Sequence, residues 1–486
     1  MARVGHTAAA PVAASDQEVD LQTTRLAVLA LVVLAKAAHA QPNLPYVQRV
    51  EKLVQPAEPT DATYEREVAT SKSYLVPALE VSSLLILTNI GARIAGQGWA
   101  DATPDTMWHN ITHKWVYDND TFSVNQLAHP YGGALLYTSA RSSGHGFFTS
   151  FSYAAMGSLL WEVLAETEPP SINDQITTTI AGAFLGEVMH RWGRAVLWGG
   201  GDVPGYGRRI MAASIDPMGA ANGGLIAERW LRTPPPRLHA FIAVGPNLGI
   251  GAFNDSSLHS ELSVSHGLPS DPRFEPTVPF DHFDVRSQID LGRDGVTGYL
   301  DVRGMLFGTA HGDATGRTLW GLFGTYAYWD ADSVRAGAIG FGPGFAAHRL
   351  LGSETFLEAS AVLAVVPWGA AGGTNDIEGI RDYAHAPGAS EIFKLEIGRR
   401  GFGVARLSGR AIQIAGNLVD EGNEAVVLTS AGAMVAVAEH HALGFEFAYS
   451  ARYASLADAP NPFDQSAQLR IVYAIISDSK FGGGEP

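Results

Sequence analysis

The period of the hydrophobic pattern changes at one point in the chain, and this change constrains the fold most strongly. Upstream of the segment TPPPR (Thr233–Arg237), apolar residues recur with helical spacing, and from Leu238 onward they alternate with polar residues. Alternation indicates β-strands, because neighbouring side chains of a strand point to opposite faces. Consecutive prolines cannot continue a helix, so TPPPR marks a boundary. The sequence therefore predicts an α+β chain, with a helical domain at 71–232 and a strand domain at 237–480.

The predicted strands are long and carry their aromatic residues on the apolar face. In HFDVRSQIDLG one face is polar, with Asp284, Arg286, Gln288 and Asp290, and the other is apolar, with Phe283, Val285, Ile289 and Leu291. In LGFEFAYSARY the aromatic residues oppose Glu446 and Arg452. About twelve such runs of roughly ten residues follow one another, which is typical of a transmembrane β-barrel with a polar lumen. We therefore predict an antiparallel transmembrane barrel of about twelve strands.

The upstream helical segments are apolar on more than one face and rich in Ala, Gly and Ser. Small residues let helix backbones approach closely. The first segment, SYLVPALEVSSLLILTNIGARIAG (Ser73–Gly96), approaches the length of a membrane span, but Glu80, Asn89 and Arg93 interrupt it. The pattern predicts a compact helical bundle that lies in the periplasm or plugs the lumen of the barrel.

The N-terminus has the parts of a secretory signal peptide. Arg25 precedes the apolar run Leu26–Ala35, and Ala38-His39-Ala40 supplies a cleavage site. Ten apolar residues are too few to span a bilayer, so we expect residues 1–40 to be removed and residues 41–70 to form an exposed leader. Export and a barrel together predict the outer membrane of a Gram-negative bacterium, with the lipid bilayer and the outer-membrane assembly machinery as partners.

Composition excludes several classes of function. The chain has no cysteine, so disulfides and thiol chemistry are excluded. Its formal charge of -16 disfavours nucleic acid, which requires clustered cations facing phosphate. No phosphate-binding, dinucleotide or metalloprotease motif is present, so the sequence predicts no cofactor, and it leaves the presence of a metal open.

Four residues of the helical domain are candidates for an acid/base or mixed-ligand metal site. His129 precedes a helix that carries Arg141, Glu162 lies on the next helix, and Asp174 opens a third. In the catalytic interpretation His129 is the base or a ligand, Glu162 and Asp174 are acid/base partners, and Arg141 binds an anion.

A structural interpretation of the same residues competes with the catalytic one. Ser171 and Asp174 have the S-x-x-D spacing of a capping box. Glu187 and Arg191 are spaced i, i+4 and can form an ion pair, although Arg141 is an alternative partner for Glu187. Glu162 would then hydrogen-bond a neighbouring helix end. Because ion pairs that serve only the fold also concentrate polar groups, the sequence favours this interpretation and leaves enzymatic activity open.

Four stretches resemble a known family: VNQLAHPYGGALLYTSARSSGHGF (Val124–Phe147), GSLLWEV (Gly157–Val163), EPPSINDQITTTIAGAFLGE (Glu168–Glu187) and LWGLFGTYAYWD (Leu319–Asp330). Together they resemble the bacterial domain of unknown function 3943, strongly over Tyr74–Arg194 and more weakly in the strands. The resemblance implies an envelope or outer-membrane protein and supplies no activity. The helical part also resembles, faintly, a VanZ-like pattern.

Two functions are compatible with these sequence patterns. The first is a structural role or passage of a small solute through a lumen lined by charges of both signs, such as Asp284, Arg286, Glu446 and Arg452. The second is an envelope enzyme that acts on lipid or cell-wall material through the His129, Glu162 and Asp174 site.

Overall fold

The structure, a computed structural model, describes residues 69–118, 120–199, 203–225, 238–250, 256–272, 274–293, 295–313, 315–331, 334–372, 383–415, 422–456, 463–477 and 481. The predicted signal peptide, nearly all of the predicted leader and the TPPPR boundary lie outside the described residues.

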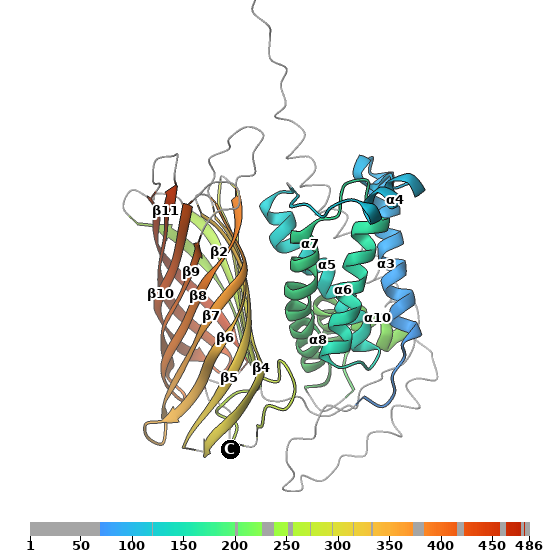
Figure 1. Ribbon diagram of the computed structural model, residues 1–486. Coiled ribbons are helices and arrows are strands. Elements are labelled where there is room, and N and C mark those ends of the chain that lie inside the picture. Colours follow the sequence, from blue (N-terminus) through green and yellow to red (C-terminus); the bar gives the residue numbers. More distant parts are fainter. Residues whose placement is uncertain are drawn as a thin grey trace, which may run out of the picture.

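The helical domain is built around four long helices that lie side by side (Figure 1). They are α3 (Leu75–Ile94), α5 (His129–Ser142), α6 (Phe147–Leu164) and α8 (Gly182–Trp198). Helix α5 is central and packs against the other three. Shorter elements complete the domain: η1 (Gly98–Ala100), α4 (Pro104–Thr112), α7 (Ile172–Ile176), α9 (Tyr206–Ile215) and α10 (Pro217–Leu225). Two π-helical segments, η2 (Val124–Ala128) and η3 (Thr177–Ala181), lead directly into α5 and α8.

Twelve antiparallel strands form a closed barrel in which each strand pairs with its neighbours in sequence and β1 pairs with β12. The strands are β1 (Leu238–Gly249), β2 (Ser256–His266), β3 (Phe283–Leu291), β4 (Val296–Asp313), β5 (Gly316–Ala331), β6 (Val334–Leu350), β7 (Thr355–Gly372), β8 (Tyr383–Arg399), β9 (Gly403–Ala415), β10 (Gly422–Ala438), β11 (His441–Leu456) and β12 (Phe463–Ile476). The predicted fold class, a helical bundle followed by a twelve-stranded barrel, is confirmed.

The two faces of the wall differ in chemistry, as the alternation predicts. Arg286 and Glu446 meet inside the barrel, so the alternate residues of their strands face outward. Outward apolar side chains such as Ile289, Phe445 and Ile471 are exposed on the barrel surface. A polar interior combined with an apolar exterior is the pattern of a transmembrane barrel.

The helical bundle lies outside the barrel, beside the wall that contains β3 to β8 (Figure 1). The ring of Phe184 in α8 lies 5.3 Å from that of Phe280 and 5.7 Å from that of Phe341 in β6, measured between centroids. The ring of Phe122 likewise packs against the rings of Tyr328 of β5 and Tyr383 of β8, with centroids 5.6 and 5.4 Å apart. The sequence left open whether the helices plug the lumen or lie outside it, and the described helices lie outside it. An apolar helix surface buries equally well against the outside of an apolar wall, and the sequence pattern does not distinguish the two arrangements.

Candidate functional site

The crossing of α5 with η3 and α8 positions the predicted site. Gly133 and Gly182 lie where the two backbones meet, and a Cβ added to Gly133 would fall 1.8 Å from the carbonyl oxygen of Thr178. Glycine is therefore required at 133 for this approach, which brings the first turn of α5 against η3. His129 follows η2 directly and Thr178 lies within η3, so both residues are presented by π-helical segments, which occur frequently at functional sites.

The imidazole of His129 lies between carboxylates and a hydroxyl. Its Nε2 is 3.5 Å from Oδ2 of Asp174 and 3.9 Å from Oδ2 of Asp120. Its Nδ1 is 3.4 Å from Oγ1 of Thr178. The side chain of Asp174 is 5% exposed, whereas those of His129 and Asp120 are 18% and 50% exposed. The imidazole thus lies between the buried Asp174 and the half-exposed Asp120, and its Nε2 is buried.

A second group of polar residues surrounds Asp118. The amide groups of Asn125 and Asn173 each donate to Oδ1 of Asp118 at 2.9 Å. Burial would raise the pKa of Asp118, but the hydrogen bonds from Asp174, Asn125 and Asn173 outweigh burial and hold that pKa well below its usual range. Asn125 also donates to the hydroxyl of Tyr383 at 2.6 Å, which connects this group to the barrel wall.

Glu162 has a different role from the one that the catalytic interpretation gives it. Its Oε2 accepts a hydrogen bond from the backbone amide of Ser171 at 2.8 Å, where α7 begins. Ser171 accepts in turn from the amide of Asp174 at 3.2 Å, so only half of the predicted capping box forms within α7. Glu162, from α6, supplies the other half. The carboxylate of Asp174 is thereby left to face His129 and Asn173.

Arg141 does not join His129. It lies about 18 Å further along α5, the length of twelve residues of an ideal helix. Its Nε and Nη2 contact the two carboxylate oxygens of Glu187 at 2.5 and 2.8 Å. The expected pair between Glu187 and Arg191 is also present, with Nε 2.7 Å from Oε1. Glu187 thus binds both arginines, and the hydroxyl of Tyr137 donates to it as well.

Arg191 connects this buried group to the barrel. Its Nη1 lies 3.0 Å from Oδ1 of Asp281, and its Nη2 donates to the carbonyl of Pro279 at 3.2 Å. Both partners belong to the connection between β2 and β3. The ion pairs of Glu187 therefore hold the helices together and fasten them to one end of the barrel. Because Glu187 already occupies the guanidinium of Arg141, the structure does not support the anion-binding role predicted for that residue.

The lumen is the second candidate site, and charged side chains cross it. Arg286 on β3 donates to Glu446 on β11 at 2.6 Å and to Ser408 on β9 at 3.0 Å. Strand β9 is opposite β3 in the closed strand order. Arg410 on β9 likewise pairs with Asp301 on β4. The two sides of the lumen are therefore joined by ion pairs.

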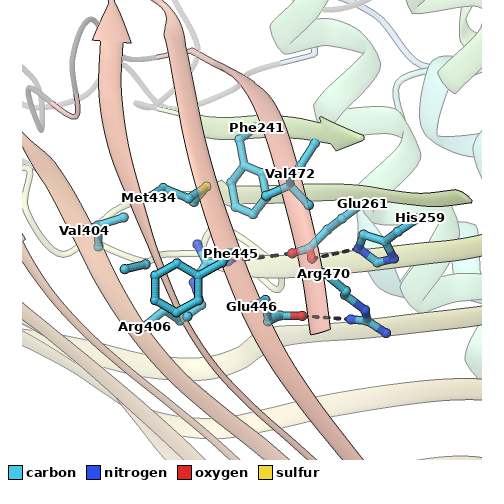
Figure 2. Close-up of a pocket in the computed structure, with 13 residues that line it drawn as sticks. Phe241, His259, Glu261, Val404, Arg406, Met434, Phe445, Glu446, Arg470 and Val472 are labelled. Atoms are coloured by element: carbon cyan, nitrogen blue, oxygen red, sulfur yellow. Dashed lines mark hydrogen bonds and ion pairs between the residues drawn. The ribbon is translucent and has the colours of Figure 1, made fainter. Parts of the chain in front are cut away.

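These pairs separate two unequal spaces. Figure 2 shows the smaller one, where Glu261 lies against His259 and Glu446 against Arg470, next to the apolar side chains of Phe241 and Val472. The larger space is a vestibule of about 600 Å³ at the end of the lumen where β1 leads into β2. It is lined by residues near the β1–β2, β3–β4 and β11–β12 connections, among them Ser256, Arg293 and Phe463.

Asp118, Asn125, Asn173 and Thr178 were not predicted as site residues. The run Asp118-Asn119-Asp120 indicates a turn in the sequence, and turn residues carry no signal of the side chains they will meet. Within the part of the chain that the structure describes, no group of three or more His, Asp or Glu side chains has an arrangement that could hold a metal ion.

The helical part of the candidate site lies in a segment that matches a known protein domain. A model of a domain of unknown function, DUF3943, matches residues 114–218, which include His129, Glu162, Asp174 and Glu187. The resemblance to this domain is therefore confirmed over residues 114–218, 105 of the 486 residues. The DUF3943 match begins later than the resemblance seen in the sequence and extends further, through α9. A search among curated proteins found no match.

Solved structures resemble the barrel half of the chain at low similarity. A bacterial polysaccharide outer-membrane secretin has 7% identity and a TM-score of 0.22, covering 49% of this chain and 97% of that chain. The CymD monoaromatic hydrocarbon channel has 8% identity and a TM-score of 0.23, with coverages of 50% and 88%. An anion-selective porin from Comamonas acidovorans has 9% identity and a TM-score of 0.19, with coverages of 49% and 99%. At these values the barrel assignment rests on the strand pairing alone.

Proposed function

We propose that the protein resides in the outer membrane and that its DUF3943 segment carries an acid–base site that acts on the headgroups of outer-leaflet lipids. In this proposal the barrel provides the outer surface on which the helices that carry the site pack. The outer-membrane assembly machinery that inserts other barrels would insert this one.

The loops support an orientation for the barrel. The connections after β4, β6, β8 and β10 have two to four residues, whereas those after β1, β7, β9 and β11 have six to ten. The 16-residue connection after β2, which binds the bundle, and the two-residue turn after β5 depart from this division. Outer-membrane barrels have short periplasmic turns and longer extracellular loops. Tyr383, which binds Asn125, begins β8 directly after one of the longer connections. In the orientation that we propose, the His129 end of the bundle faces the cell surface and the Arg191 end faces the periplasm.

The observation that carries the proposal is the position of the His129 imidazole between Asp174 and Thr178. A carboxylate on one nitrogen and a hydroxyl on the other is the order of groups that activates a hydroxyl, and such contacts are often long in an unliganded protein. Asp174 holds the ring from its buried side. The neutral imidazole of His129 removes a proton from the attacking hydroxyl, either that of Thr178 or that of a water in its place. The hydroxyl oxygen bonds to the phosphorus of a headgroup phosphodiester, the bond from phosphorus to the leaving alcohol oxygen breaks, and His129 returns the proton to that oxygen.

The experiment compares the outer-membrane lipids of cells that produce the wild type, Asp174→Asn or His129→Gln, or that lack the protein. Lipid mass spectrometry should show a headgroup change that requires the protein and is lost in both variants. Heat-modifiable gel mobility checks that equal amounts of barrel are folded in the membrane.

Asp216→Asn is the matched control. Asp216 pairs with His190 at 3.1 Å, and both side chains are almost fully buried at the other end of the bundle, so that pair cannot reach a headgroup. Normal lipid chemistry in Asp216→Asn with loss in Asp174→Asn supports the acid–base site. Equal losses in both variants, following protein level, would show that Asp174 serves only the fold.

Passage of a small solute is a second candidate, favoured by the vestibule of about 600 Å³. A solute that enters the vestibule meets the ion pairs of Arg286 and Arg410, which join opposite strands. Passage therefore requires these pairs to separate, whereas the site at His129 requires no rearrangement of the barrel.

A further inference from the structure

The surface of α3 that faces away from the barrel is apolar and uncovered. Leu75, Leu79, Ile86, Leu87 and Ile94 are each more than half exposed. A membrane span needs about 20 apolar residues, and the 20 residues of α3 reach about 30 Å, the thickness of a bilayer core. Among the described helices, α3 alone is long and apolar enough by these measures, and only 17% of its apolar window is buried.

The polar residues that interrupt α3 all bind inside the protein. Glu80 accepts from the amide of Asn222 at 3.1 Å. Asn89 donates to the carbonyls of Ala100 and Ala165, at 2.9 and 2.7 Å. Arg93 lies at the end of the helix and donates to two carbonyls of the following turn. The polar groups that argued against a span in the sequence are therefore satisfied without water, as hydrocarbon requires.

The bundle also lies at the height of the barrel wall. Near the surface end, Tyr117 stacks on Trp368 of β7, with ring centroids 5.6 Å apart. Near the periplasmic end, Phe148 of α6 stacks on Phe307 of β4 at 6.2 Å. Contacts at both ends place the helices along the strands, and Figure 1 shows the same arrangement. A barrel inserted in a membrane would carry this bundle into the hydrocarbon layer.

We propose that the four-helix bundle is embedded in the outer membrane beside the barrel, with the exposed face of α3 in contact with lipid acyl chains. This rests on the outer-membrane location given above. Four passes, up through α3, down through α5, up through α6 and down through α8, return the chain to the periplasmic side, where β1 begins. The acid–base site then lies at the level of the lipid headgroups.

The absence of cysteine allows a direct test by single-cysteine labelling in cells. Leu87→Cys probes the middle of α3, and Ile242→Cys, on the exposed outer face of β1, is the matched control in the barrel wall. Lys114→Cys and Tyr206→Cys probe the two ends of the bundle. A water-soluble, membrane-impermeant maleimide is applied to intact cells, to cells with a permeabilised outer membrane and to detergent extracts.

We expect Leu87→Cys and Ile242→Cys to react only in detergent. Lys114→Cys should react on intact cells, and Tyr206→Cys only after permeabilisation. Reaction of Leu87→Cys before detergent, while Ile242→Cys stays protected, would overturn the embedding and leave the outer-membrane location intact. Reaction of both would overturn the location itself. If Leu87→Cys forms a dimer cross-linked through this position, the exposed face of α3 contacts a second copy of the chain and not lipid, and the proposal is overturned.

Discussion

Glu162 of α6 accepts a hydrogen bond from the backbone amide of Ser171, the residue that caps α7, at 2.8 Å. A carboxylate three residues after the cap supplies this acceptor in a capping box, and Asp174 occupies that position. Since Glu162 performs this task from another helix, Asp174 can turn toward His129. Glu162 thus leaves Asp174 available for the pair with His129 on which the proposed site depends.

Glu162→Gln should therefore have nearly wild-type stability and lipid activity, because the glutamine carbonyl still accepts from Ser171. Glu162→Ala leaves a buried amide unpaired and should lower the free energy of unfolding by about 1–3 kcal/mol. Loss of helical circular dichroism on heating measures the stability. If Glu162→Gln abolishes the lipid change while the protein remains folded, Glu162 takes part in the proton transfer.

Gly133→Ala should destabilise the bundle by about 1–3 kcal/mol, the usual cost of overpacking, because its Cβ would overlap the carbonyl of Thr178. The neighbouring Gly132→Ala is the matched control, since its added Cβ meets no atom within 4 Å. Alanine favours a helix by up to about 1 kcal/mol over glycine, so Gly132→Ala should be neutral or stabilising. The melting temperature of Gly133→Ala should therefore fall while that of Gly132→Ala stays the same or rises, and equal values would show that the α5–η3 crossing is looser than described.

The sequence predicted the barrel well because alternation is a local signal that repeats in each strand. Asp284, Arg286 and Glu446 were predicted to face the lumen only because they occupy alternate positions along their strands. The structure brings Arg286 and Glu446 together there. The alternation of side chains along one strand does not reveal which strands are opposite each other in a closed barrel. The ion pairs that cross the lumen, and with them the barrier to passage, therefore could not be predicted.

The helical site was predicted less completely, for a related reason. His129, Glu162 and Asp174 stand out as polar residues next to apolar helices, and the structure gathers them at one end of the bundle. Glu162, and not Asp174, accepts from the amide of Ser171, and this depends on how α6 packs against α7. The exclusion of Arg141 depends on Glu187 reaching it from α8. Both are tertiary relationships without a local sequence signal.

The wild-type protein should show no single-channel steps in a planar bilayer, because ion pairs join opposite sides of its lumen. Replacing both Arg286 and Arg410 with Ala removes their contacts across the lumen and leaves Glu446 and Asp301 in excess, while Arg406 still contacts Glu261. The double variant should conduct and prefer cations. Arg399→Ala, which removes an exposed pair with Glu354, should behave as wild type. Steady conductance by the wild type would mean that the lumen opens without these substitutions.

The stability of the bundle should fall between about pH 5 and pH 8 through Glu166. Burial, and then the negative charge of Glu162, raise the pKa of Glu166 to about 8. As the pH rises above the ordinary pKa of a glutamate, the unfolded chain loses this proton first, so the folded state loses relative stability until its own pKa is passed. In Glu166→Gln, which keeps an acceptor for the indole of Trp161, the midpoint temperature of helix loss should vary less over this range. An unchanged pH profile would show that Glu166 is solvated and ionised throughout.

Only α3 among the described helices is apolar enough by composition to cross a membrane, although four helices lie beside the barrel. This matters for secretion, because a chain bound for the outer membrane must first leave the inner one. A strongly hydrophobic helix is retained by the translocon, whereas buried charges such as Arg141, Glu187 and Arg191 make insertion unfavourable. The charges that pair in the folded bundle would therefore also let its unfolded helices pass through the inner membrane, and Arg191 meets Asp281 only when the bundle docks on the finished barrel.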